Sequence, residues 1–137
     1  MAVETIEHGG TLYAQVIWSD TEVEETKFFS PDESSFQFGL LAHKAGFKEA
    51  PHKHKSFERV IDDLQQMFVV QRGRVDVILY SDEGDKLRTI SLKQGDAIVL
   101  IHGVHAIEVQ EDMQCISVKQ GPFLGTEYDK VFVEVRE

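Results

Sequence analysis

The chain has 137 residues, and its 14 basic and 24 acidic side chains give a formal net charge of −10 at pH 7. This length is typical of one domain, and 42% hydrophobic residues suffice for one core, so we expect a single domain over residues 1–137. The acidic balance argues against nucleic-acid binding, which needs a basic face to displace counterions from phosphates. It also argues against docking on an anionic membrane.

The cysteine content and the first residues predict a cytoplasmic protein. A single cysteine, Cys115, excludes an internal disulfide. Residues 1–10 are acidic and lack the apolar stretch of a signal peptide, and no run of about 18 apolar residues exists to span a membrane. Cys115 lies in an alternating apolar stretch, residues 113–118, which favours a small buried hydrophobic residue over a nucleophile.

Short apolar runs, many of them alternating with polar residues, recur between turn residues along the whole chain, which predicts an all-β, antiparallel fold. In chain order, the predicted strands are Thr11–Trp18, Lys27–Ser30, Phe36–His43, Met67–Val70, Arg74–Tyr80, Leu87–Leu92, Ala97–Ile101, Ala106–Val109, Cys115–Lys119 and Lys130–Val135.

Turn residues and composition add further expectations. Residues 71–73 (Gln-Arg-Gly) predict a hairpin between two of these strands, and residues 82–85 predict a second tight turn. Helical periodicity is weak, and residues 56–66 are expected to form one helical turn or an extended lid. We expect Lys130–Val135 to be an edge strand and most of the nine phenylalanines to pack in the core.

Three histidines fall in positions that suggest a metal site. His52 and His54 are two residues apart, so in a strand their side chains share one face and can bind one ion together. His105 begins another predicted strand, after Gly95 and Gly103. His8 and His43 are expected at the surface, where histidines are common.

These residues resemble the two motifs of the cupin superfamily, G-x5-H-x-H-x3-4-E-x6-G and G-x5-P-x-G-x2-H-x3-N. The resemblance covers about residues 36–118, and Ile101 stands where the second motif has proline. The spacing after Gly103 is also one residue shorter than in the family. The matching residues are Gly46, His52, His54, Gln66, Gly73, Gly95, Gly103 and His105, with Gln66 in the place of the family's glutamate.

The resemblance implies a single double-stranded β-helix, a jelly-roll barrel, with an N-terminal strand and a C-terminal extension packed on it. It also implies one divalent metal ion inside the barrel, bound by His52, His54, Gln66 and His105. Glu58 competes for the fourth position because it has the literal motif spacing from His54. Gln66 is favoured because a glycine, Gly73, follows it at the family's distance.

Three imidazoles and an amide oxygen would leave the ion its full double charge, which makes it a strong Lewis acid for carboxylate or enolate ligands. The three imidazoles and the amide oxygen suit Fe, Mn, Ni, Co or Zn. The resemblance implies an enzyme acting on a small oxygenated metabolite, as an oxygenase or an isomerase or epimerase, with Glu58 or His102 moving a proton. Residues 118–130 look similar to small bacterial cupins of sugar and polysaccharide pathways.

Two other functions stay open at this point. The protein could bind a small sugar or organic acid without turnover, which the glutamine at position 66 makes credible, or it could be a structural protein whose histidines bind nothing. Cupins commonly form dimers, so we expect a homodimer that uses the strand Thr11–Trp18 and the C-terminal extension.

Overall fold

The protein, described here over residues 2–137 by a computed structural model, is built mainly from antiparallel strands, which confirms the all-β prediction. Its contacts divide it into two compact units, one of residues 2–21 and 65–137 and one of residues 22–64. The prediction of a single domain stays a prediction.

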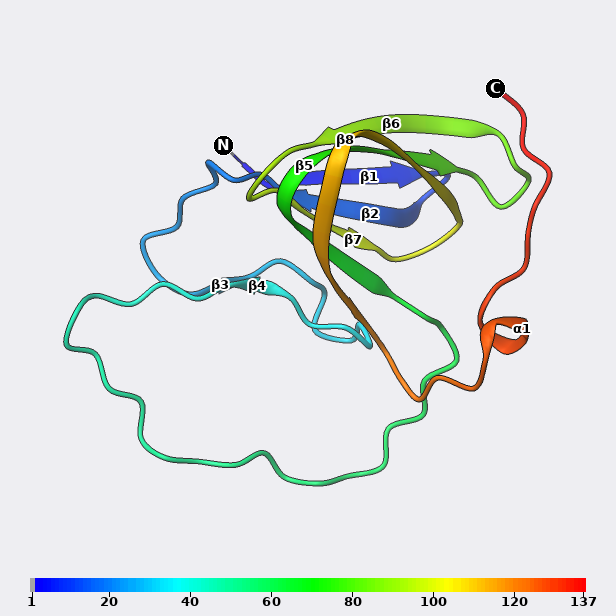
Figure 1. The fold of residues 1–137 in the computed structure, drawn as a ribbon. Helices are drawn as coiled ribbons and strands as arrows, with labels where there is room; N and C mark the ends of the chain where they lie inside the picture. The colour runs from blue at the N-terminus through cyan, green and yellow to red at the C-terminus, as the bar shows by residue number, and fades with distance from the viewer. Residues whose placement is uncertain (1) are drawn as a thin grey trace. The chain divides into compact units, whose positions relative to one another are not determined.

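The first unit is a curled, half-barrel sheet of six strands (Figure 1). Its strand order is β1-β2-β7-β5-β6, and β8 pairs with β5. A double-stranded β-helix stays a prediction. The strands are β1 (Glu4–His8), β2 (Thr11–Ile17), β5 (Gln66–Tyr80), β6 (Lys86–Leu92), β7 (Ala97–Leu100) and β8 (Val104–Lys119).

Strand β5 holds this sheet together because it pairs with three others. Its first residues, Gln66–Val69, pair with β7, and its last residues, Val75–Tyr80, pair with β6. Strand β8 runs antiparallel to β5 from Gln66 to Tyr80. The segments predicted as separate strands at 106–109 and 115–119 are therefore parts of one strand, β8.

The hairpin predicted at residues 71–73 is wrong, because β5 bends there and continues. The register between β5 and β8 shifts three times between Val70 and Val75, which marks a bulged region. Gly73 has φ +85°, and a Cβ on it would overlap the backbone carbonyl of Asp112 on β8. The glycine therefore permits close approach of the two strands at a bend, and β8 keeps both halves of β5 paired.

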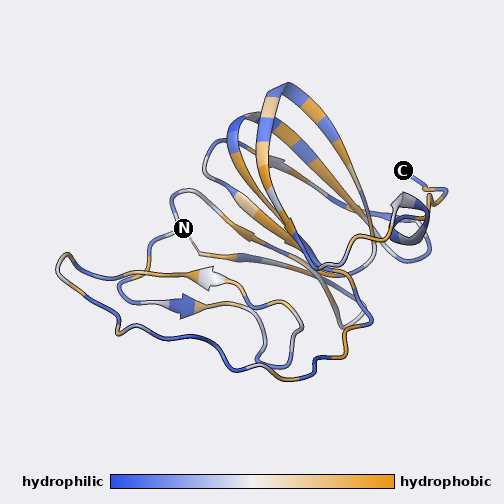
Figure 2. Ribbon diagram, turned by 60° about the horizontal axis from the view of Figure 1, so that its bottom comes forward, coloured by the Kyte–Doolittle hydropathy of each residue, from blue (hydrophilic) through white to orange (hydrophobic). Residues whose placement is uncertain are grey.

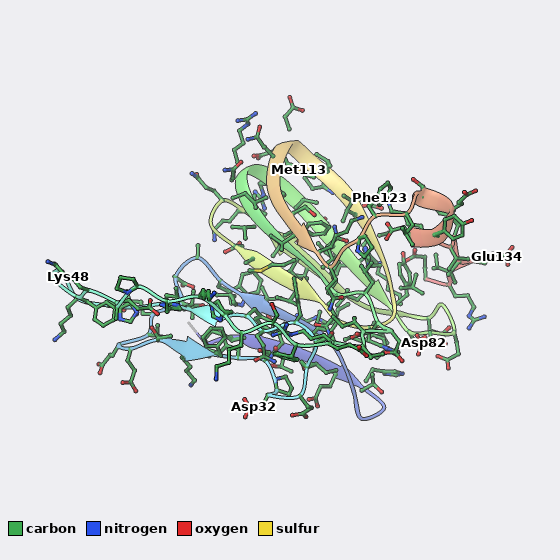
Figure 3. All side chains as sticks on the ribbon, turned by 90° about the horizontal axis from the view of Figure 1, so that it is seen from below. Asp32, Lys48, Asp82, Met113, Phe123 and Glu134 are labelled. Atoms are coloured by element: carbon green, nitrogen blue, oxygen red, sulfur yellow. The ribbon has the colours of Figure 1, made fainter. Side chains whose placement is uncertain are left out.

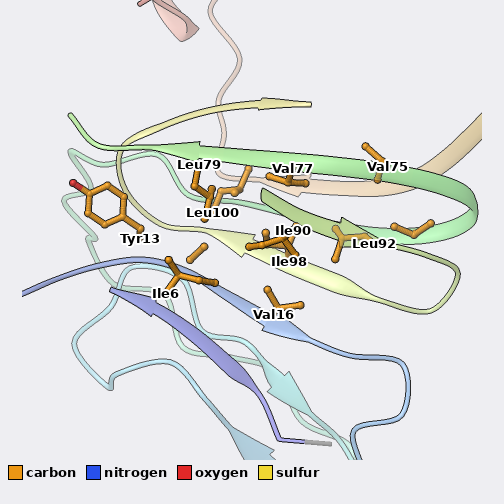
Figure 4. Close-up of a cluster of buried hydrophobic side chains, with 12 residues drawn as sticks. Ile6, Tyr13, Val16, Val75, Val77, Leu79, Ile90, Leu92, Ile98 and Leu100 are labelled. Carbon is orange, nitrogen blue, oxygen red and sulfur yellow. The ribbon is translucent and has the colours of Figure 1, made fainter. Parts of the chain in front are cut away.

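The core of the first unit lies on one face of the sheet (Figure 4). Alternate residues of β5, namely Val75, Val77 and Leu79, contribute to it, as do Ile98 and Leu100 of β7. Bands of hydrophobic and hydrophilic residues accordingly alternate along the long curved strands (Figure 2). Fully burying each such side chain stabilises the fold by roughly 1.5–3 kcal/mol.

Strand β1 was not predicted, because only one of its five residues is buried. Ile6 packs in the core, and its neighbours are polar and partly or fully exposed. The strand forms because Gly9 and Gly10, both with positive φ, reverse the chain and let Glu4–His8 pair with β2. The second predicted turn, at residues 82–85, is confirmed between β5 and β6.

The second unit has little regular structure. Strands β3 (Lys27–Phe28) and β4 (Gly39–Leu40) form a two-stranded ladder, so the strands predicted at 27–30 and 36–43 shorten to two residues each. Between them, Gln37 donates to the carbonyls of Pro31 and Ser34, and such side-chain bonds replace the strand ladder. Residues 56–64 form no helix, and Lys48 lies in the same long irregular stretch (Figure 3).

The C-terminal segment departs most from the predictions. It contains a short helix, α1 (Thr126–Asp129), and then runs without regular structure to a single bridge between Arg136 and Asp85, so the predicted edge strand at 130–135 is wrong. Within residues 2–137, no helix is long and apolar enough to cross a membrane. Five of the nine phenylalanines are exposed, which contradicts the expected core role: Phe28, Phe47, Phe57, Phe123 and Phe132.

Candidate metal centre and apolar pocket

His105 lies on the core-facing side of the curled sheet, which we call the inner face. Directly paired residues of antiparallel strands share a face, and His105 on β8 pairs with Leu79 of the core. The next inner-face residues of β8 are Ile107 and Val109, which are also exposed. Strand β8 thus presents a histidine and two apolar side chains on the inner face.

Gln66 lies on the same face. It pairs with Leu100 of β7, which belongs to the same core cluster as Leu79 (Figure 4). Its Nε2 donates a hydrogen bond of 2.9 Å to Ser117 Oγ on β8. Since the amide nitrogen is held by this bond, the carbonyl oxygen Oε1 is the atom of Gln66 that suits a metal ion.

The surroundings of His105 favour its neutral form. The ring is exposed at its surface but lies in a region dense with protein atoms. This desolvation, together with the positive charge of Lys130, lowers the pKa of His105 below its ordinary value of 6.5. A neutral imidazole keeps the nitrogen lone pair that metal ligation needs.

In the second unit, His52 and His54 lie side by side, with ring centroids 5.4 Å apart and ring planes at 80°. His52 Nδ1 is 3.0 Å from the carbonyl oxygen of Ala50, and because a carbonyl only accepts, Nδ1 carries the hydrogen. Nε2 of His52 then remains for a ligand, and it lies 3.4 Å from Glu49 Oε1. Glu58 is exposed, farther along the same irregular segment.

The structure therefore brings His52 to His54, and it places Gln66 and His105 on one face of the sheet. The two pairs belong to different units, so the four-residue site stays a prediction. Across the described residues 2–137, no three His, Cys, Asp or Glu side chains form a group that could hold a metal ion.

His102 occupies a bend between β7 and β8 rather than a strand. Its Nε2 lies 2.7 Å from Oδ2 of Asp82, which is in the turn between β5 and β6 (Figure 3). Its ring contacts the Tyr13 ring edge-on, with the ring centroids 5.2 Å apart. Gly103 has φ +83°, and a Cβ there would overlap the Tyr13 ring, so this bend requires glycine. The proposed proton-transfer role of His102 stays a prediction, and Asp82 is the carboxylate that orients its ring.

A pocket of about 280 Å³ opens on the first unit, between β5 and β8. The pocket was not predicted from the sequence, although the alternation of apolar and polar residues at 113–118 indicated that Met113 and Cys115 share one face of a strand. Met113, on β8 near the bend, is labelled in Figure 3. The lining residues are Phe68, Val75, Ile107, Met113, Cys115 and Ser117.

Cys115 is half-buried in this wall, with its Sγ 3.3 Å from the sulfur of Met113. Burial raises the pKa of the Cys115 thiol above its ordinary value. The thiol is therefore mainly protonated at neutral pH, in line with the predicted apolar role and against a nucleophilic one.

Comparisons with known protein families, with curated proteins and with solved structures found no match. The cupin resemblance accordingly stays a prediction.

Proposed function

We propose that this protein is a metal-binding protein of the cupin type that acts on a small oxygenated metabolite, by oxygenase or by isomerase or epimerase chemistry. One divalent ion would be held by His52, His54, Gln66 and His105. The proposal rests above all on the shared inner face of Gln66 and His105, which pair with two residues of one core cluster. The adjacent rings of His52 and His54 give it further support.

The donor atoms suit such an ion. The surroundings of His105 favour a neutral ring, and Gln66 offers Oε1. Nδ1 of His52 donates to Ala50, so Nε2 is the nitrogen that would bind the ion, in place of its contact with Glu49 Oε1. These ligands are compatible with Fe, Mn, Ni, Co or Zn, and an ion bound by them would supply Lewis acidity. Glu58, exposed in the segment that follows His54, or His102, in the bend before β8, is proposed to move the substrate proton.

The metal content of protein purified without a histidine tag tests this proposal. We expect about one divalent ion per chain, and loss of bound metal in both His52→Ala and His105→Ala because each variant removes a ligand. His43→Ala is the matched control, since that ring stacks on Phe47 at 3.9 Å and belongs to no proposed ligand set. Absence of stoichiometric metal, or unchanged affinity in both variants, would remove the metal site.

Two more measurements separate the remaining alternatives. Gln66→Ala is expected to lower the metal affinity by at least about tenfold, as loss of a ligand should, whereas a larger loss in Glu58→Ala would assign the fourth position to Glu58. Metal-dependent turnover across a panel of small acids, carbonyl compounds and sugars would support an enzyme. Binding without turnover would favour a ligand-binding protein.

We also propose a homodimer in the cytoplasm. The strand predicted to contact the second copy, Thr11–Trp18, is β2 and already pairs with β1 and β7, so it offers no edge. Among the described residues, β1 pairs with a strand on one side only, and its other edge suits a dimer. Light scattering at micromolar concentration is expected to give twice the 15.6 kDa of one chain, and the mass of one chain would contradict the dimer.

A further inference from the structure

The pocket between β5 and β8 has the chemistry of a ligand site. Of the described residues, the six that line it include no charged side chain, and four are apolar: Phe68, Val75, Ile107 and Met113. Their wall therefore has few partners for a ligand rich in hydroxyl groups, because buried hydroxyls need hydrogen bonds. It suits an aromatic or branched-alkyl group.

The size of the pocket sets the size of the ligand. Its volume of about 280 Å³ is near the lower end of small-molecule sites. An apolar protein cavity of about 150 Å³ is known to bind benzene. One substituted aromatic ring, or a branched chain of similar volume, therefore fits here.

Ser117 supplies one directional polar contact at the pocket. Its Oγ accepts a hydrogen bond from Gln66 Nε2, so the hydroxyl hydrogen remains to be donated. A ligand carbonyl or carboxylate oxygen would accept it. The same hydrogen bond links the pocket to Gln66, one of the proposed metal ligands.

We propose that this pocket binds the apolar body of a small carbonyl or carboxylate compound, with an aromatic or branched-alkyl group against Phe68, Ile107 and Met113 and an oxygen accepting from Ser117. If the ligand is the substrate, the proposal rests on the proposed function and favours an aromatic or branched acid over a sugar. Binding of the ligand to the pocket needs no metal, so the test uses metal-free protein.

The only cysteine of the chain lies in the pocket wall, so alkylation of Cys115 by N-ethylmaleimide reports on occupancy. The probe is 4-methylbenzoate, and xylose is the comparison ligand. The alkylation rate is expected to fall by a factor of 1 + [probe]/Kd, or about tenfold when 4-methylbenzoate is at about ten times its Kd. Xylose at the same concentration is expected to leave the rate unchanged.

Two tryptophan variants make the test specific. Ile107→Trp fills the pocket and is expected to abolish protection by 4-methylbenzoate. Glu108→Trp, on the opposite face of β8 and outside the lining, is expected to keep it. Ser117→Ala, which removes one oxygen and little volume, is expected to weaken 4-methylbenzoate binding and leave toluene binding unchanged.

The proposal is overturned if 4-methylbenzoate does not slow the alkylation of the wild-type protein, if xylose slows it equally, or if protection survives in Ile107→Trp. Because burial raises the pKa of Cys115 and slows its alkylation, the NMR shifts of the Ile107 methyl groups are the second measurement, and shifts that do not change on addition of 4-methylbenzoate would also overturn the proposal. Since all samples are metal-free, these outcomes leave the metal site untouched, and the metal-content assay decides that separately.

Discussion

Near the C-terminus, Arg136 anchors the chain to the turn between β5 and β6. Its Nε donates to Asp85 Oδ1 at 2.7 Å, and its backbone N–H donates to the carbonyl of Gly84 at 2.7 Å. The hydrogen bond from Arg136 holds the pKa of Asp85 below its ordinary value of 3.8. Because the folded-state pKa is lowered, this contact stabilises the fold above the unfolded-state pKa and is lost as the pH falls through the folded-state value.

We therefore expect the carboxyl carbon of Asp85, followed by NMR, to titrate with a midpoint below 3.8. In Arg136→Gln, which keeps a similar shape without the charge, the midpoint should return toward 3.8. Identical midpoints in the two proteins would show that the ion pair does not form in solution.

Gly73 is a second position where one residue determines local geometry. An alanine there would adopt an unfavourable backbone angle and would also overlap the carbonyl of Asp112. Gly73→Ala is expected to lower the free energy of unfolding by at least about 2 kcal/mol, measured by urea denaturation. Gly9→Ala is the control, because Gly9 has φ +57° and open space around it, so its loss should be about 1 kcal/mol. Equal losses would mean that close approach of β8 to the bend is not required.

At the scale of the element, the two strands of the β5–β8 ladder make different contributions to stability. Leu79 is 1% exposed on the inner face, whereas Val109, on the same face of β8, is 52% exposed. Leu79→Ala is expected to destabilise the protein by about 2–5 kcal/mol, because it leaves a cavity in the core. Val109→Ala should cost less than about 1 kcal/mol. Similar losses of unfolding free energy at the two positions would contradict an inner face that is buried along β5 and exposed along β8.

The strand pattern was predictable from sequence where apolar residues face the core at regular positions or in a continuous run. Two strands lie within one residue of their predicted bounds, Leu87–Leu92 and Ala97–Ile101. Alternating apolar residues predicted the first, and a continuous apolar run predicted the second. Long-range pairing was not predictable in the same way. The sequence Gln-Arg-Gly at 71–73 suits a hairpin turn, but pairing with β8 on both sides makes it a bend.

Exposed apolar residues explain most of the other wrong predictions of strands and core residues. Phe132 is 92% exposed, and residues 130–135 alternate like a strand without joining a sheet. Alternation requires only that one face be suitable for burial, and whether another strand covers that face depends on tertiary contacts. The inner-face pocket escaped prediction for the same reason, since its walls come from β5 and β8 residues far apart in the sequence.

At the scale of the whole molecule, the proposed metal centre would use residues from both units. The spacing of His52 and His54 predicted a pair, and the structure has their rings adjacent, although in an irregular segment rather than a strand. The inner-face positions of Gln66 and His105 follow from strand register, which motif spacing alone does not give. We propose that the two pairs share one ion.

Stepwise addition of Zn²⁺ to metal-free protein with ¹⁵N-labelled histidine rings tests that claim most directly. We expect the ring nitrogens of His52, His54 and His105 to shift together and the change to be complete at about one equivalent of Zn²⁺, while those of His8 and His43 stay unchanged. If the ring of His105 does not respond while His52 and His54 do, or if all six histidines shift gradually, the proposed shared metal centre is wrong.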